Sequence, residues 1–224
     1  MIFLLPPFCF AQETRNLISK AKVPAEADRV EKFAPAGWKI EEQVSGDLNA
    51  DSVPDYALKL VEDKPAKDSE DIATERQRAL VIVLQKEGRK LYRAAVADKL
   101  LQCTRCGGAF YGVSESPANV KIEKGVLVVD QDHGSRNLTN TTYRFRYDAA
   151  SQQFILIGFD YADADRATAN VNSESTNYLT GVRITTRGKG NRDVKSRSII
   201  PVKKISIETV DSEKYEEAAA KRLG

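Results

Sequence analysis

The chain has 224 residues, with 34 Lys and Arg against 32 Asp and Glu and a formal net charge of +2. This near balance argues against a nucleic-acid-binding protein, which usually carries a larger excess of positive charge. Hydrophobic residues make up 42% and charged residues 29% of the chain, so the composition argues against disorder and suits one domain with a sizeable core.

The N-terminal residues 1–11 are apolar, and the polar sequence Gln12-Glu13-Thr14-Arg15 follows abruptly. This pattern is typical of the later part of a secretory leader, with Cys9 and Ala11 as small residues before a cleavage point, although a basic opening segment is missing. The apolar run is too short for a membrane span, which needs roughly 20 residues. We expect an exported protein, periplasmic or secreted; the alternative is a short hydrophobic segment packed into the core.

Residues 12–35 predict a linker or short helices, because the segment is weakly helical and Pro24 divides it. A single β domain is expected over residues 36–210, where strand signals dominate. Its first two expected strands, 38–44 and 56–61, enclose an acidic turn.

The acidic turn has the sequence Gly46-Asp47-Leu48-Asn49-Ala50-Asp51-Ser52-Val53-Pro54-Asp55. Side-chain oxygens at loop positions 1, 3, 5 and 9 and a backbone carbonyl at position 7 can surround calcium, which takes six to eight oxygens at roughly 2.3–2.6 Å. The residues at these positions are Asp47, Asn49, Asp51, Asp55 and, through its carbonyl, Val53. We therefore predict calcium as the bound metal. The alternative is a metal-free turn held by its own hydrogen bonds.

This turn differs from an EF-hand. Ser52 stands where an EF-hand has glycine, Leu58 stands where it has a bidentate glutamate, and strands are expected on both sides. The turn resembles the strand-loop-strand calcium turn of FG-GAP and VCBS repeats, which are blades of β-propellers. The resemblance covers the turn alone, and the chain is too short for the four or more blades of a propeller.

Further strands are expected after a charged loop at 62–78, and they lie at 79–84, 90–96, 120–123, 126–129, 141–147, 154–159, 178–186 and 198–207. Residues 211–224 predict a C-terminal helix with Asp211 as its N-cap. The expected fold is all-β: antiparallel meanders, one near 38–97 and one near 120–160, that form a sandwich or barrel-like domain.

Cys103 and Cys106 lie directly before Gly107-Gly108. In an oxidising compartment, a disulfide that shapes this short loop is the first interpretation. Redox activity is disfavoured because no strand-helix-strand pattern follows. Zinc would need two more ligands, and the chain offers only His133 and Cys9. Free thiols are the remaining alternative.

Signatures of catalysis are weak. His133 lies near Ser135, but nothing resembles a nucleophile elbow, so we interpret it as an exposed turn histidine. A second acidic cluster, predicted to be a solvated loop because its spacing fits no calcium site, comprises Asp160, Asp163, Asp165 and Asn170.

Six cations gather around Gly188 and Gly190: Arg183, Arg187, Lys189, Arg192, Lys195 and Arg197. A hairpin tip this basic is able to bind an anionic surface such as lipid head groups or a cell-wall polymer, although most such tips are merely solvated.

Several stretches together resemble a group of uncharacterised exported bacterial proteins: residues 33–38 with 46–49, 103–108, 143–148 with 156–158, and 177–181. The resemblance implies export and no particular activity. We therefore expect an exported, non-catalytic, calcium-stabilised β-protein that binds an anionic envelope component or another exported protein, or has a structural role in the envelope. The alternative is a hydrolase of envelope polymers, in which Asp130, Asp132 or Asp160 pairs with another carboxylate at roughly 5–9.5 Å.

Overall fold

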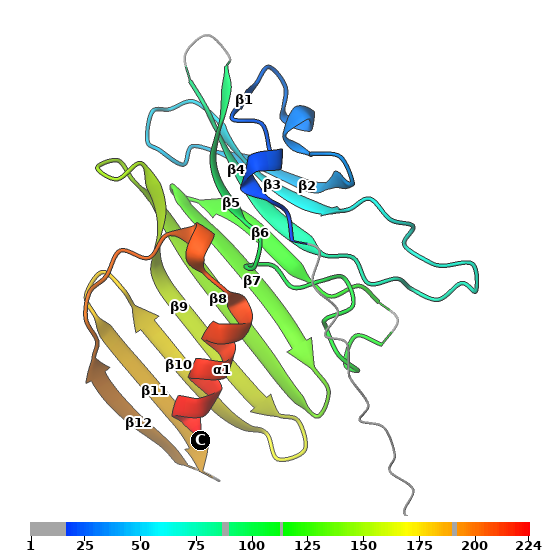
Figure 1. Cartoon of the computed structure of the whole chain (residues 1–224). Helices are drawn as coiled ribbons and strands as arrows, with labels where there is room; N and C mark the ends of the chain where they lie inside the picture. The colour runs from blue at the N-terminus through cyan, green and yellow to red at the C-terminus, as the bar shows by residue number, and fades with distance from the viewer. Residues whose placement is uncertain (1–16, 87–89, 113, 190–191) are drawn as a thin grey trace, which may run out of the picture.

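Two antiparallel sheets and a C-terminal helix make up the described part of the chain, residues 17–86, 90–112, 114–189 and 192–224 (Figure 1). The structure is a computed structural model. The expected leader and the first residues of the expected linker lie outside the described part.

The first sheet has five strands in the order β1-β5-β4-β3-β2. Their bounds are β1 Glu26–Ala27, β2 Trp38–Gly46, β3 Asp55–Glu62, β4 Arg78–Gln85 and β5 Leu91–Ala97. The central strand β4 is buried from Arg78 to Leu84, because both of its faces are covered. The N-terminal segment, with the short 3-10 helices η1 (Lys20–Lys22) and η2 (Val30–Phe33), packs on one face through Phe33.

The second sheet is a seven-stranded meander in which every strand pairs with its neighbours in the sequence. Its strands are β6 Ala118–Glu123, β7 Val126–Gly134, β8 Asn137–Asp148, β9 Gln153–Asp165, β10 Asn170–Asn177, β11 Val182–Lys189 and β12 Arg192–Ile199. Leu80 and Ile82 of β4 share one core with Leu127 and Phe145 of this sheet. The two sheets therefore bury one continuous apolar layer between them.

Helix α1 (Ser212–Leu223) covers the part of the seven-stranded sheet that the first sheet leaves open (Figure 1). Tyr215 of α1 packs edge-on against Tyr143 and Phe159, with ring centroids 6.0 and 5.4 Å apart. Edge-to-face aromatic pairs of this kind add about 0.5–1.5 kcal/mol beyond the burial of their area. The alternation of β8 thus places its aromatic residues toward the core and its arginines on the opposite face of the sheet.

The fold class agrees with the prediction from the sequence: antiparallel β-structure with short N-terminal helical turns and a C-terminal helix. The sheets are not closed, so the sandwich alternative holds and the barrel alternative does not. Asp211 caps α1 as predicted, accepting a hydrogen bond from the Lys214 N–H. None of the described helices is long and apolar enough to cross a membrane.

The last three strands differ from the prediction. Expected strands at 178–186 and 198–207 are replaced by β10, β11 and β12, and the second meander extends well beyond residue 160. The reason is that β10, with the sequence Asn-Val-Asn-Ser-Glu-Ser-Thr-Asn, has almost no apolar residue to mark a buried face. Pairing with β9 and β11 on its two sides makes it a strand.

A candidate binding pocket beside the acidic turn

The acidic turn connects β2 to β3, as the sequence predicted, and the register of the two strands ends at Gly46 opposite Asp55. Leu48 anchors the turn because its side chain is buried in the core between the sheets. Ser52 has a φ of 65°, in the left-handed region. A non-glycine residue in that region costs about 1 kcal/mol, which is the cost expected from serine at the glycine position of a calcium loop.

Asp47 organises the turn through its carboxylate. Its oxygens accept hydrogen bonds from the backbone N–H groups of Asn49, Ala50 and Ser52 at 3.2, 2.7 and 2.9 Å. Loss of water contacts alone would raise the pKa of Asp47, but these N–H donors outweigh it and hold the pKa below its usual value. The carboxylate is therefore ionised at neutral pH.

Asp55 ties the turn to the sheet. Its side chain is fully buried, and it accepts hydrogen bonds from the N–H groups of Leu48 and Gln85, both at 2.9 Å. Burial raises the pKa of Asp55 above its usual value, the two N–H donors oppose this, and the negative charges of Asp51 and Asp47 add to the increase. A nearby cation would favour the charged form of this carboxylate.

The donor set suits calcium in kind, but the three carboxylates do not all converge on one point. Three oxygens bound to one calcium ion lie within roughly 5 Å of one another. The carboxylates of Asp47, Asp51 and Asp55 do not all come within 4.8 Å. Because β3 and two N–H donors hold Asp55 in place, a calcium ion here would be ligated directly by the Asp47, Asn49 and Asp51 end of the turn. Asp55 would then act through a water, as position 9 of calcium loops often does.

The turn also has the hydrogen bonds of the metal-free alternative. Asp51 accepts from the Val53 N–H at 2.8 Å and from the Asn49 side-chain amide at 2.9 Å, and Asn49 accepts from the Asp51 N–H at 3.1 Å. The turn is therefore ordered by its own polar groups. A cation would add to this network, because most of the oxygens keep a second lone pair.

A surface pocket of about 570 Å³ lies beside the acidic turn. Three turns line it: residues 46–50 of the acidic turn, then Ile122, Lys124 and Gly125 of the β6–β7 hairpin, and Arg146, Tyr147 and Ala149 at the β8–β9 hairpin. A Cβ atom on Gly46 would lie 2.7 Å from the Ile122 side chain, so this glycine allows the end of β2 to pack against β6. The pocket brings together parts of the chain that are far apart in the sequence.

Two cations line the pocket. The side chains of Arg146 and Lys124 are exposed, and neither has an ion pair or hydrogen bond to any other residue in the part of the chain that the structure describes. Tyr147 also lines the pocket and packs on Phe154 with ring centroids 5.3 Å apart. The pocket therefore offers two positive charges and an aromatic side chain, and Asp47 is also among its lining residues.

Comparison of the chain with protein-family models, curated proteins and solved structures gives no match.

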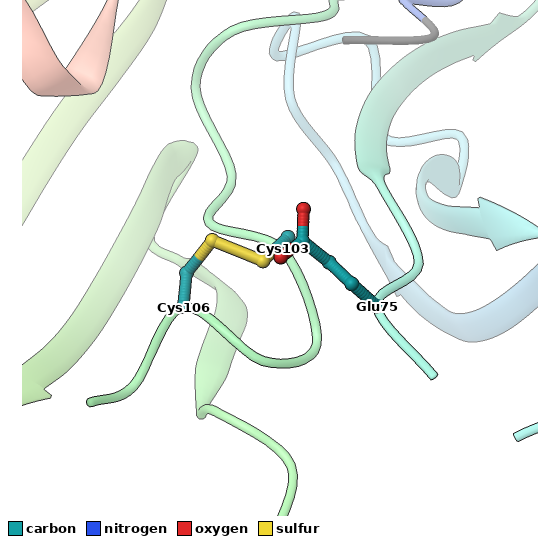
Figure 2. Close-up of side chains that lie close together, drawn as sticks. All are labelled: Glu75, Cys103 and Cys106. Carbon is teal, nitrogen blue, oxygen red and sulfur yellow. A yellow bond between two sulfur atoms is a disulfide. The ribbon is translucent and has the colours of Figure 1, made fainter. Parts of the chain in front are cut away.

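The predicted disulfide between Cys103 and Cys106 is present, with the sulfur atoms 2.12 Å apart. Glu75, which the sequence analysis did not single out, lies against it (Figure 2). Glu75 comes from the loop before β4, and no spacing in the sequence connects it to the cysteines. Only the tertiary structure brings it close to them.

His133 is not an exposed turn residue, contrary to the interpretation from the sequence. It belongs to β7, and its Nε2 lies 2.6 Å from a carboxylate oxygen of Glu216 on α1. The hydrogen bond to Glu216 raises the pKa of His133 and outweighs the opposing effect of burial. The histidine therefore links the helix to the sheet.

The carboxylates considered for a hydrolase lie on one sheet face. Asp130 and Asp160 are the cross-strand neighbours of Thr142 on its two sides, so their Cα atoms are roughly 9–10 Å apart. Asp130 accepts from the Thr142 hydroxyl at 2.7 Å, and Asp160 contacts Arg144 at 2.5 Å. Neither lines the pocket described above.

The second acidic cluster is likewise on strands and not in the predicted loop. Asp163 and Asp165 end β9, where Asp165 pairs with Arg136 at 3.1 Å and Asp163 accepts from Asn137 at 2.7 Å.

The six cations predicted to form a basic hairpin tip differ in their surroundings: some pair with groups of the protein and others are exposed. Arg183 pairs with Glu174 at 3.2 Å, and Arg187 donates to the carbonyls of residues 222 and 223 at the C-terminus of α1. The side chain of Lys189 lies outside the described part. The remaining three, Arg192, Lys195 and Arg197, are exposed on the edge strand β12.

Proposed function

We propose that this is an exported, non-catalytic binding protein whose pocket beside the acidic turn takes a ligand with an anionic group. The observation that carries the proposal is a pair of cations, Arg146 and Lys124, whose side chains have no ion-pair or hydrogen-bond partner among the described residues and which lie in a pocket formed by three turns. The volume of about 570 Å³ lies in the range of small-molecule sites, roughly 300–1,000 Å³.

The chemistry of the pocket favours an acidic sugar unit of an envelope polymer. A carboxylate or phosphate pairs with the guanidinium of Arg146 in a two-point contact, and the ring of Tyr147 offers an apolar surface to the rest of the ligand. Asp47, which also lines the pocket, repels a second anionic group. Calcium bound at the acidic turn would reduce that repulsion and strengthen binding.

Calorimetric titration with an oligosaccharide of uronic acids tests this proposal, with a neutral oligosaccharide of the same length as the control ligand. We expect Arg146→Ala to weaken binding at least tenfold, and Lys195→Ala, which removes a cation from β12, to leave it unchanged. Equal binding of the two oligosaccharides would contradict the proposal. A loss with Lys195→Ala but not with Arg146→Ala would assign binding to the basic edge strand instead.

The calcium part of the proposal has its own test. A ligand that binds only the native state increases the free energy of unfolding, by about 2.7 kcal/mol when its concentration is 100 times Kd. The melting temperature rises as a result. We expect millimolar calcium to stabilise the wild-type chain and Asp193→Asn, which changes an exposed carboxylate on β12. Asp51→Asn should lose the effect. An unchanged melting temperature of the wild type at millimolar calcium would leave the metal-free turn as the correct description.

A further inference from the structure

Glu75, Cys103 and Cys106 form a compact group of ligand atoms. A carboxylate oxygen of Glu75 and the two Sγ atoms all lie within 4.8 Å of one another, the one such group of three His, Cys, Asp or Glu side chains among the described residues. Figure 2 shows the Glu75 side chain reaching toward the sulfurs from a different segment of the chain. Cys103 is buried, Cys106 is half-buried and Glu75 is exposed, so the group is reachable from solvent on one side.

The backbone, and not the disulfide alone, brings Glu75 to the cysteines. Thr104 is fully buried, and its N–H donates to the carbonyl of Arg76 at 3.0 Å. The Arg76 N–H donates in return to Thr104 Oγ1 at 3.0 Å. These bonds join the residue after Glu75 to the residue after Cys103, and they do not depend on the S–S bond. We therefore expect the two segments to stay side by side when the disulfide is reduced.

The other side of the cysteine loop is fixed in the same way. Ser116 donates its N–H to the carbonyl of Thr104 at 2.9 Å, and Gly134 at the end of β7 donates to the carbonyl of Gly107 at 2.9 Å. Gly108 has a φ of 70°, and a Cβ atom there would lie 2.6 Å from the Gly134 carbonyl oxygen. Only glycine allows the loop to lie this close to β7.

We propose that Glu75, Cys103 and Cys106 bind a divalent zinc ion when the disulfide is reduced, so that the same side chains alternate between a disulfide and a metal site. A dithiol reductant first breaks the S–S bond, yielding two cysteine thiols while the reductant becomes a disulfide. Zinc then displaces the two thiol protons and forms two Zn–S bonds and one Zn–O bond, with water in the fourth position of a tetrahedron.

The choice of zinc follows from the ligands. Thiolates are soft donors that select zinc over calcium or magnesium, and two cysteines three residues apart are a common half of a zinc site. The sequence alone lacked a third ligand within reach, and the fold supplies Glu75. His133 does not belong to the group, because its Nε2 is engaged by Glu216. Three protein ligands leave an open position, so the zinc is expected to exchange readily.

This inference does not rest on the proposed function, because the pocket and the cysteine loop share no residue. It makes the loop a sensor of redox conditions: an oxidising compartment closes the site, and a reducing one opens it to zinc. Oxidation of the zinc-bound form by a small-molecule disulfide, which is itself reduced to two thiols, would release the metal and remake the Cys103–Cys106 disulfide.

Cobalt absorption tests the proposal, because Co²⁺ replaces Zn²⁺ and thiolate ligation gives a charge-transfer band in the near ultraviolet. The full chain carries Cys9→Ser in every sample, so that Cys103 and Cys106 are its only thiols. It is reduced with a phosphine, transferred anaerobically to metal-free buffer and titrated with Co²⁺, then with Zn²⁺. We expect one Co²⁺ per reduced chain, displacement by Zn²⁺, and no band from the oxidised chain.

The third ligand is tested with a matched pair of variants. Glu75→Gln should weaken Co²⁺ binding by about tenfold, whereas Glu70→Gln, an exposed change in the same loop, should leave it unchanged. Absence of the band in the reduced wild type would overturn the proposal, and equal affinities of the two variants would remove Glu75 from the site. Far-ultraviolet circular dichroism accompanies each titration. If reduction unfolds the chain, restoration of the spectrum by the metal supports the site, and failure to restore it overturns the proposal.

Discussion

The N–H of Leu48 donates to the buried carboxylate of Asp55 at 2.9 Å, and this bond joins the tip of the acidic turn to the start of β3. The other oxygen of Asp55 accepts from Gln85 at the end of β4. One side chain therefore satisfies backbone donors from two different segments.

Removal of this carboxylate is expected to destabilise the protein. Asp55→Ala leaves the N–H groups of Leu48 and Gln85 without their acceptor. Each buried unsatisfied group costs about 1–3 kcal/mol, so the two together should lower the free energy of unfolding by roughly 2–6 kcal/mol. Asp51→Ala, on the exposed side of the turn, should cost less than about 1 kcal/mol because water replaces the lost bonds. Urea unfolding of both variants measures the difference. Equal losses would mean that Asp55 does not anchor the turn.

The pH dependence of stability should carry a contribution from Asp55. Burial raises the pKa of Asp55 above its ordinary value of 3.8, so the folded chain binds the proton more tightly than the unfolded chain. The contribution of Asp55 to the free energy of unfolding therefore falls as pH rises from about 3.8 through the pKa of the folded state, and it is constant above that pKa. Burial also raises the pKa of Asp98, so this residue changes the free energy of unfolding in the same direction. The difference between wild type and Asp55→Asn across pH 3–7 isolates Asp55, and a constant difference would contradict the raised pKa.

The His133–Glu216 pair should make the docking of α1 on the sheet depend on pH, in a higher pH range than the contribution of Asp55. The hydrogen bond to Glu216 raises the pKa of His133 above 6.5, so its stabilising contribution is fully present below pH 6.5 and is lost as pH rises through the folded pKa. Glu216→Gln should cost about 1 kcal/mol at pH 5.5 and little at pH 9. Glu217→Gln, an exposed change on the same helix, serves as the control. Chemical unfolding at the two pH values gives the comparison.

Local patterns predicted much of this fold. The continuous apolar run of β4, the alternation of Tyr143 and Phe145 with arginines in β8, and the N-cap at Asp211 depend on neighbouring residues, so the sequence shows them directly. The acidic turn between two strands and the Cys103–Cys106 disulfide were also predictable, because both lie within a few residues.

Features set by distant pairing could not be predicted in this way. β10 is polar except for Val171, and only its two neighbours make it a strand. The approach of Glu75 to the cysteines depends on the bonds between Arg76 and Thr104, and the His133–Glu216 pair depends on where α1 docks. The pocket has the same origin, since its three turns meet only in the folded chain.

Glu174 shows how such distant pairing changes the interpretation of a residue. Its carboxylate is fully buried on β10 and contacts Arg222 of α1 at 2.5 and 2.8 Å and Arg183 of β11 at 3.2 Å. The sequence predicted Arg183 to be part of a basic surface, whereas in the structure it neutralises the buried charge of Glu174. Removal of one partner of a buried ion pair leaves the other uncompensated.

We therefore expect Glu174→Gln to destabilise the fold by about 3 kcal/mol. Asp193→Asn, on the exposed strand β12, should change stability by less than about 0.5 kcal/mol, as surface substitutions usually do. Measurements in high salt distinguish buried from exposed charges. In 1 M sodium chloride, Glu174→Gln should still lower the free energy of unfolding by most of that amount, because buried pairs are screened far less than exposed ones. A loss that disappears in high salt would show that the cluster is open to solvent, and would make Arg183 available to an anionic partner.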